Sequence, residues 1–357
     1  MSKSLALLLL VSPVLLSAGL LLNDDVSTPA SAPVAQGPPP LLPEDRVFDP
    51  QSIVNSKRVW LDVEVLLWQA SEDGLDYAVK SSAQDHVDDG KVKSPDFEWD
   101  WGVQAGLGIK LPHDQWDLFF NYTYVQARAH SSVSAPDGGA VFPVFEAPFG
   151  LPDNFFADHA RFRWKANLNI GDIELGRNCL ISRWLSIRPF FGVRGLTIDQ
   201  EGHIEYEGGT AAPGGDEDLV KLMNNFWGVG LRVGLNTLWG LGKGIGIYGN
   251  GAASLVSGSF DVEEKERFKS TRQNRLDVSA DTDSVTAIAE IALGLQWDRF
   301  FSQNRYHFGV KLGWELNVFF DQNNLVRFLN STNPGAISRN NGDLTFQGLT
   351  LGFRLDF

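Results

Sequence analysis

From Lys57 to the C-terminus, the dominant feature of the sequence is an alternation of apolar and polar residues with a period of two. In the clearest run, the apolar positions are Trp99, Trp101, Val103, Ala105, Leu107, Ile109 and Leu111. An α-helix repeats every 3.6 residues and cannot place such a run on one face, whereas a β-strand does so because successive side chains point to opposite sides. The pattern therefore predicts strands throughout this part of the chain.

Nine further segments show the same alternation. They are 59–67, 116–124, 162–170, 185–193, 227–235, 245–255, 285–297, 308–320 and 349–357. Most of the ten segments have about ten residues or more, which is enough to cross a hydrocarbon layer when the strand is tilted. Strands of soluble β-sandwiches are usually nearer six residues. Their length therefore favours membrane-spanning strands.

The connections between these segments are long and short in turn. Long polar stretches occupy 69–98, 129–159, 197–223, 259–283 and 321–343, and short ones occupy 112–114, 177–183, 241–242 and 300–304. Transmembrane barrels have tight periplasmic turns and long external loops. We therefore predict an all-β fold: a transmembrane antiparallel up-and-down β-barrel of about ten strands, formed by residues 57–357, in the outer membrane of a Gram-negative bacterium.

Aromatic residues support this prediction, because tryptophan and tyrosine concentrate at membrane interfaces. Near the loop ends lie Trp99, Trp101, Tyr122 and Tyr124, and near the turn ends lie Trp116, Trp184 and Trp297. In the alternative interpretation, these rings fill the core of a soluble protein.

The N-terminal residues predict export. Lys3, the apolar run from Leu5 to Leu16 and the small residues that follow are typical of a secretory signal peptide, predicted as residues 1–22. An uncleaved membrane anchor is the alternative. Residues 23–56 are rich in proline and predict an extended periplasmic linker. The single Cys179 cannot form an internal disulfide.

Three phrases resemble a known family. They are Trp99-Asp100-Trp101-Gly102-Val103-Gln104-Ala105-Gly106-Leu107-Gly108, Trp116-Asp117-Leu118-Phe119-Phe120-Asn121-Tyr122-Thr123 and Asn225-Phe226-Trp227-Gly228-Val229-Gly230-Leu231-Arg232. With the alternating terminal strand that ends on Phe357, they look like the Legionella-type pore-forming outer membrane protein family, which is grouped with chlamydial major outer membrane proteins. The resemblance implies a pore-forming barrel, and recognition of Phe357 by the barrel assembly machinery. Chlamydial relatives are rich in cysteine, so the single Cys179 argues against a disulfide-linked envelope.

Once the apolar face is assigned to lipid, alternation assigns the remaining residues to the lumen. The predicted pore-lining residues are Asp62, Glu64, Asp100, Asp117, Arg161, Arg163, Lys165, Arg188, Arg194, Arg232, Glu290, Lys311 and Glu315. We expect Arg188 and Arg232 to face Asp62 and Glu64 across the lumen. Opposed basic and acidic walls would act on passing ions. In the alternative, the charges pair and plug a narrow barrel.

The sequence carries no recognisable catalytic constellation. Gly244-Ile245-Gly246-Ile247-Tyr248-Gly249 matches a dinucleotide fingerprint, but that motif needs a following helix and here lies within a predicted strand, with Gly244 and Gly246 facing the lumen. A barrel protease would need paired acidic and histidine residues at the outer rim, and the candidates are Asp199 with His203, and Asp281 with Asp283. We therefore expect no enzymatic activity, no cofactor and no metal site.

The predicted function is a porin-like pore that passes small hydrophilic solutes or ions by diffusion. A closed structural or adhesive barrel is the main alternative, and a barrel enzyme is a weaker one. The expected partners are outer-membrane lipid and lipopolysaccharide, and the homo-oligomeric state is left open. The formal net charge of −14 and the acidic loops argue against nucleic acid as a partner.

Overall fold

The structure is a computed structural model that describes residues 59–84, 89–112, 114–147, 155–272, 274–301, 306–328 and 336–357. The predicted signal peptide 1–22 and linker 23–56 lie outside the described residues. Within these ranges, no helix is long and apolar enough to cross a membrane.

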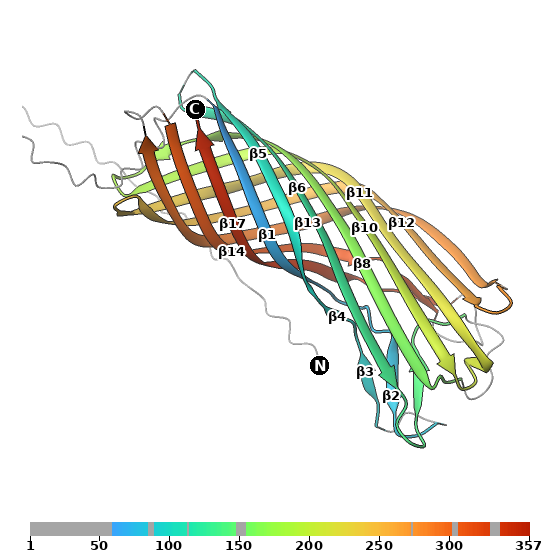
Figure 1. Cartoon of the computed structure of the whole chain (residues 1–357). Coiled ribbons are helices and arrows are strands. Elements are labelled where there is room, and N and C mark those ends of the chain that lie inside the picture. The colour runs from blue at the N-terminus through green and yellow to red at the C-terminus, as the bar shows by residue number, and fades with distance from the viewer. Residues whose placement is uncertain are drawn as a thin grey trace, which may run out of the picture. The chain divides into compact units, whose positions relative to one another are not determined.

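In the described part of the chain, ten long strands form a closed antiparallel barrel (Figure 1). They are β1 (Val59–Glu72), β5 (Trp99–Lys110), β6 (Trp116–Ser134), β8 (His159–Arg177), β10 (Leu185–Gly208), β11 (Ala212–Gly242), β12 (Ile245–Phe268), β13 (Asn274–Phe301), β14 (Tyr306–Asn323) and β17 (Gly342–Asp356). Each strand pairs with its neighbour along the chain, and β17 pairs with β1 to complete the circle. The predicted ten-stranded barrel is confirmed.

Seven shorter strands accompany the barrel. They are β2 (Ala78–Ser81), β3 (Lys91–Lys93), β4 (Asp96–Phe97), β7 (Ala140–Pro143), β9 (Cys179–Leu180), β15 (Val326–Phe328) and β16 (Ile337–Arg339). The connections after β1 and β6 join in one small sheet, because β2 pairs with both β3 and β7. Figure 1 places β2 and β3 at the end of the barrel opposite the C-terminus.

The barrel strands are strongly staggered. The row of paired residues that starts at Leu66 reaches Thr282 of β13 when followed through β5 to β12. Followed the other way through β17 and β14, the same row reaches Gly294, twelve residues further along β13. Such a stagger tilts the strands by about 40° from the barrel axis. A row of paired residues therefore climbs along the barrel as it goes round.

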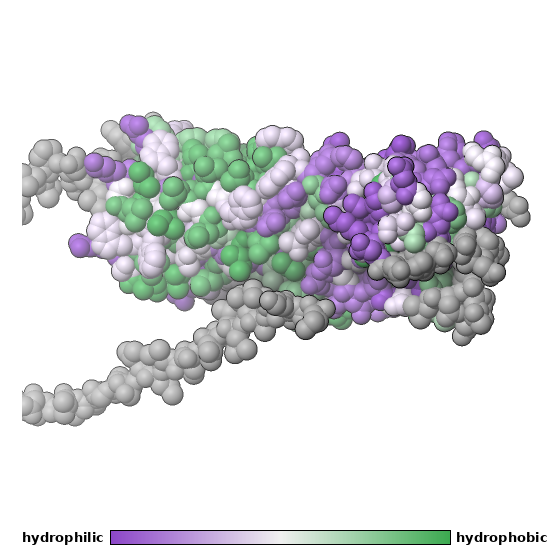
Figure 2. Space-filling model, turned by 90° about the horizontal axis from the view of Figure 1, so that it is seen from below, coloured by the Kyte–Doolittle hydropathy of each residue, from purple (hydrophilic) through white to green (hydrophobic). Residues whose placement is uncertain are grey.

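The half of the barrel nearest the C-terminus carries apolar side chains on its outer surface, shown in green in Figure 2. We call this surface the apolar band. Its outward residues include Leu61, Val63, Leu107, Ile109, Leu118, Phe120, Phe191, Val193, Val229, Leu231, Val233, Leu255, Leu293, Leu295, Leu312, Leu351 and Phe353. An apolar surface that surrounds a closed barrel is suited to contact with lipid. Leu231, for example, is 70 % exposed.

The other half of the barrel has the opposite polarity, and we call it the outer extension. On β10 and β13 its outward residues include Asp199, His203 and Asp281, all exposed. Figure 2 shows this end as predominantly hydrophilic. Most of the inward residues here are apolar, as in a soluble protein. The strands therefore continue beyond the lipid, with polar side chains outside and apolar ones inside.

This extension corrects two of the predicted loops. Segments 197–223 and 259–283 are strand for most of their length, and only 209–211 and 269–273 separate β10 from β11 and β12 from β13. Both segments keep the alternation of a strand. They were predicted as loops because their outward residues are polar and charged. In water, such residues occur both in loops and on the exposed face of a strand.

The turn between β11 and β12 explains the glycine motif. Gly242, Lys243 and Gly244 all have positive φ angles, of 110°, 54° and 84°. Tight hairpin turns of this kind require such angles, which glycine adopts without steric cost. Gly244 therefore lies in the turn, and the prediction that it faces the lumen is wrong. Gly246 follows within β12, where it is buried.

Candidate functional site

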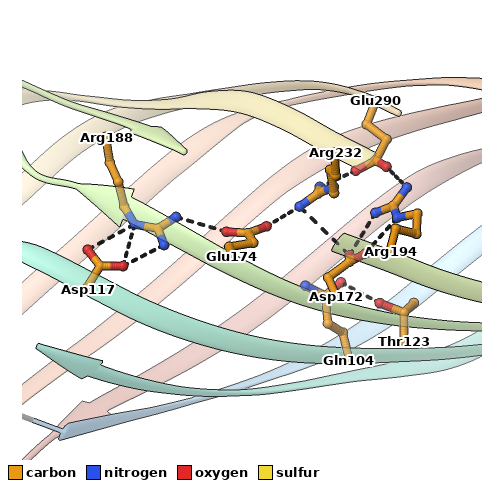
Figure 3. A network of polar contacts seen from close by, with 9 residues as sticks. All are labelled: Gln104, Asp117, Thr123, Asp172, Glu174, Arg188, Arg194, Arg232 and Glu290. Carbon is orange, nitrogen blue, oxygen red and sulfur yellow. Dashed lines mark hydrogen bonds and ion pairs between the residues drawn. The ribbon is translucent and has the colours of Figure 1, made fainter. Parts of the chain in front are cut away.

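Seven charged residues from five strands meet inside the barrel at the level of the apolar band. We call them the arginine network: Arg188 and Arg194 on β10, Arg232 on β11, Asp117 on β6, Asp172 and Glu174 on β8, and Glu290 on β13 (Figure 3). The network joins strands that are not neighbours, because β12 separates β11 from β13. It therefore crosses the interior as well as following the barrel wall.

Arg194 is the most enclosed cation of the network, with 3 % of its side chain exposed. Its Nε and Nη2 each donate a hydrogen bond to a different oxygen of Asp172, both at 2.7 Å, and its Nη1 donates to Glu290. Arg232 donates to Glu290 and to Glu174. Two parallel hydrogen bonds between a guanidinium and a carboxylate fix the orientation of both groups as well as attracting them.

Arg188 continues the network toward the turn end of the barrel. Its Nη2 donates to Asp117 Oδ1 at 2.6 Å, and its Nη1 donates to Glu174 Oε2 at 3.0 Å. A Cβ atom at Gly176 would lie 2.5 Å from the guanidinium of Arg188. Glycine at this position therefore provides the space that the arginine occupies.

A second group of charges lies on the opposite wall, formed by β1, β14 and β17. Lys311 Nζ lies 2.5 Å from Glu64 Oε1. Arg354 Nε donates to Asp356 Oδ1 at 2.8 Å, and Arg354 Nη1 lies 4.0 Å from Asp62 Oδ2. Asp62 and Glu64 therefore pair with cations on their own side of the barrel. They line the same cavity as Arg188 and Arg232, as predicted, but their ion pairs are with other cations.

A polar cavity of about 270 Å³ separates the two walls. Among its lining residues are the predicted Asp62, Glu64, Arg188, Arg194, Arg232, Glu290, Lys311 and Glu315. Asp117 lines a smaller adjoining cavity of about 110 Å³. Asp100 is buried but does not line either cavity: its carboxylate accepts a hydrogen bond from the backbone N–H of Arg128 at 2.7 Å.

Three predicted pore-lining residues face the wrong way. Arg161, Arg163 and Lys165 are exposed on the outer surface of β8, and Arg161 and Arg163 pair there with Glu205. Phe162, Trp164 and Leu168, which the prediction assigned to lipid, are buried in the interior. The physical reason is that this part of β8 belongs to the outer extension, where water rather than lipid surrounds the barrel and the polar face turns outward.

The sequence reasoning also missed Asp172 and Glu174, which hold all three arginines of the network. Both lie on β8 in the same phase as Phe162 and Leu168. The sequence does contain a signal for them. At the even-numbered positions of β8, the residues change from apolar to acidic after Ile170, and at the odd-numbered positions apolar residues begin with Ile173 and Leu175. Such an exchange of phases within one strand marks the point where its surroundings change from water to lipid.

Apolar side chains fill most of the interior of the outer extension. One row of paired residues runs from Leu66 of β1 through Gly102 of β5 to Phe260 of β12. Apart from the glycine, every side chain in this row points inward and is at most 2 % exposed: Leu66, Val125, Leu168, Ile198, Phe226 and Phe260. Tyr77 and Phe145 from the connections add to this core, and Tyr206 Oη donates to the carbonyl of Tyr77 at 2.6 Å. We call this cluster the apolar plug.

Buried carboxylates in the outer extension should make its stability depend on pH. Glu264 of β12 is 3 % exposed, and burial raises its pKa to about 8, although Arg327 opposes the shift. The folded state then retains a proton that the unfolded state loses above its ordinary value near 4.5. The contribution of Glu264 to stability should therefore be highest below about pH 4.5 and fall until the pH passes about 8.

We expect the extension to lose about 1–2 kcal/mol between roughly pH 5.5 and 7.5, and Glu264→Gln to reduce that loss, because the amide stays neutral. Amide hydrogen exchange of β11 to β13, corrected for intrinsic rates, measures the change. Asp261→Asn, on the exposed face of the same strand, is the control. An unchanged pH profile in Glu264→Gln would contradict the assignment.

A closed barrel with an apolar band, exposed aromatic residues at both edges of that band, and tight turns at the end that holds the C-terminus defines a bacterial outer-membrane β-barrel protein. Residues 55–357 match the family described as Legionella pneumophila major outer membrane protein precursor. The chain therefore belongs to this family, as its resemblance predicted, and the protein resides in the outer membrane.

Comparison with solved structures finds other barrels at low identity. The Escherichia coli outer membrane protease OmpT is 9 % identical with a TM-score of 0.45, covering 85 % of this chain and 98 % of OmpT. A TodX mutant, a monoaromatic hydrocarbon channel, is 7 % identical with a TM-score of 0.31, covering 86 % and 91 %. A Pseudomonas aeruginosa FadL homologue is 8 % identical with a TM-score of 0.26, also covering 86 % and 91 %. No curated protein matches the sequence.

Proposed function

We propose that this protein is a closed structural barrel, which displays a rigid hydrophilic extension at the cell surface and does not pass solutes in the conformation described. The apolar plug is the observation that carries the proposal. Side chains from β1, β6, β8, β10, β11 and β12 are almost completely buried against one another there. A water-filled channel would leave inward side chains exposed and would favour polar ones.

The arginine network supports the same conclusion at a second level of the barrel. Each of its three guanidinium groups is held by two or three carboxylates, and their side chains are at most 13 % exposed. Charges that line a conducting pore are usually solvated and available to passing ions. Here the charges are occupied with one another.

Passage of small hydrophilic solutes, as in a porin, is the second candidate function. The polar cavity of about 270 Å³ favours it, since it places Glu315, Lys311 and Asn250 around a space that water can enter. For solutes to cross, both the plug and the network would have to rearrange. The two candidates therefore differ in whether such a rearrangement takes place.

We infer that the protein is not a hydrolase of the outer surface. Asp199 and His203 lie exposed on the outer wall of β10, where His203 Nε2 lies 3.2 Å from Glu201 Oε1. Asp281 and Asp283 are exposed on β13. These side chains share no enclosed site in which a substrate could be held away from water.

Electrical recording from planar bilayers tests the proposal. We expect the purified full-length protein to give no sustained current steps at moderate voltage, because the apolar plug excludes hydrated ions. A trimeric porin inserted under the same conditions is the positive control, and heat-modifiable mobility on gels verifies that the sample is folded. Sustained, reproducible current steps from the folded protein would overturn the closed-barrel proposal and favour the porin-like one.

A further inference from the structure

Cationic side chains gather on the outward face of β6 and β8, immediately beyond the apolar band. Arg128 lies directly opposite Lys165 in the paired strands, and His130 lies opposite Arg163. The side chains of Arg128 and Arg163 are both 59 % exposed, and that of His130 is 70 % exposed. Two successive rows of the sheet therefore carry basic side chains on both strands.

Such an arrangement is unfavourable without an anion, because like charges directly opposite one another in a sheet repel. The charge of Arg163 is compensated by its ion pair with Glu205, and His130 Nδ1 lies 2.6 Å from Glu98 Oε1. The row of Arg128 and Lys165 is less well compensated. Asp100 lies 3.5 Å from Arg128 Nε, and Lys165 forms no ion pair with any residue in the described ranges.

The acidic residue opposite Lys165 is already occupied. Glu201 of β10 is paired with Lys165 in the sheet register, but its Oε1 lies 2.9 Å from Lys221 Nζ and 3.2 Å from His203 Nε2. The cationic row therefore retains the capacity to bind an additional anion. Arginine suits phosphate because its planar donors can bind two oxygens at once.

Below this row, polar side chains form a short ladder down to the apolar band. Gln126 Nε2 donates to Asn167 Oδ1 at 2.9 Å, and Tyr122 Oη donates to Asn169 Oδ1 at 2.8 Å. Amide and phenol groups of this kind bind the hydroxyl groups of sugars. Phe120 and Leu118 continue the same face of β6 into the band, where both are exposed.

We propose that this face of β6 and β8 is a binding site for the phosphorylated saccharide head of lipopolysaccharide. Arg128 and Lys165 bind a phosphate, the amides of Gln126 and Asn167 contact the sugars, and the acyl chains lie along the apolar side chains of β6. The order of these groups from water to lipid matches that of the glycolipid. The proposal is independent of whether the barrel conducts.

The test measures binding of purified lipopolysaccharide to the full-length protein in detergent micelles. The variant R128Q/K165Q should weaken binding by at least about tenfold. The reason is that losing one hydrogen bond between charged groups costs at least as much free energy as a tenfold change in affinity represents. The control is K265Q/R267Q, which removes two cations from the outward face of β12 near its outer end. We expect the control to bind as the parent does.

A second measurement uses the parent protein alone, so that the result does not depend on the folding of a variant. Lipopolysaccharide from which the phosphates have been removed should bind at least about tenfold more weakly than the intact glycolipid, by the same reasoning. Equal binding of the two glycolipids would overturn the proposal. So would an R128Q/K165Q variant that binds as tightly as the parent, or a control that loses as much affinity.

Discussion

Replacing Arg194 with Met should destabilise the barrel by about 3–5 kcal/mol, because it leaves the four buried carboxylates of the arginine network with two arginines instead of three. Arg194 is almost completely enclosed and makes hydrogen bonds to both carboxylates. Methionine fills a similar volume, so the loss reflects charge rather than a cavity. The measurement is the free energy of unfolding in urea, with the protein in detergent or lipid.

The matched control is Arg163→Met, which removes an arginine from an exposed ion pair on β8 and should cost less than about 1 kcal/mol. A double variant that adds Asp172→Asn to Arg194→Met should recover part of the loss, since it removes one of the excess buried negative charges. If Arg194→Met and Arg163→Met cost the same small amount, the network is solvated by channel water. That outcome would favour the porin-like function.

Replacing Leu231 with Arg should destabilise the protein by about 2–4 kcal/mol, the cost of a charge placed on the lipid face near mid-membrane. Leu231 is 70 % exposed and lies between Trp227 and Trp239 on the outward face of β11. Folding into lipid vesicles, followed by gel mobility before and after heating, gives the folded fraction as urea is varied.

Asn225→Arg is the matched control, because Asn225 lies on the same face of the same strand but within the outer extension. Water surrounds that part of β11, so the change should cost little. The contrast between two positions six residues apart locates the boundary between lipid and water. A large loss at both positions, or at neither, would contradict the polarity exchange that defines the extension.

For β10, β11 and β14, alternation alone assigned the inward side chains correctly. Arg188, Arg194, Arg232 and Lys311 all line the cavity. On β8 the same rule assigned Arg161, Arg163 and Lys165 to the lumen, although they lie outside. The rule assumes that the apolar face meets lipid, which is true only where lipid surrounds the strand. In water, the apolar face turns inward for the reason that it does in any soluble sheet.

The partners of the charged side chains could not be predicted from the sequence either. Asp62 and Glu64 line the same cavity as Arg188 and Arg232, as expected. Their ion pairs, however, are with Arg354 and Lys311. Alternation shows which residues lie on the same face of a strand. The stagger between strands determines which residues of different strands lie at the same level along the barrel axis. That stagger depends on the closure of all ten strands at once.

The sequence by itself determined the number of barrel strands, their antiparallel order, and the apolar surface formed by residues such as Leu107, Leu231 and Phe353, because these follow from a period of two and from the turns between strands. Only the tertiary structure decided how far β10 to β13 continue beyond the lipid, and that apolar side chains close the interior there. The physical reason is that a local sequence pattern shows only that the two faces of a strand differ in polarity. Whether lipid, water or other side chains lie against each face depends on how the distant strands assemble.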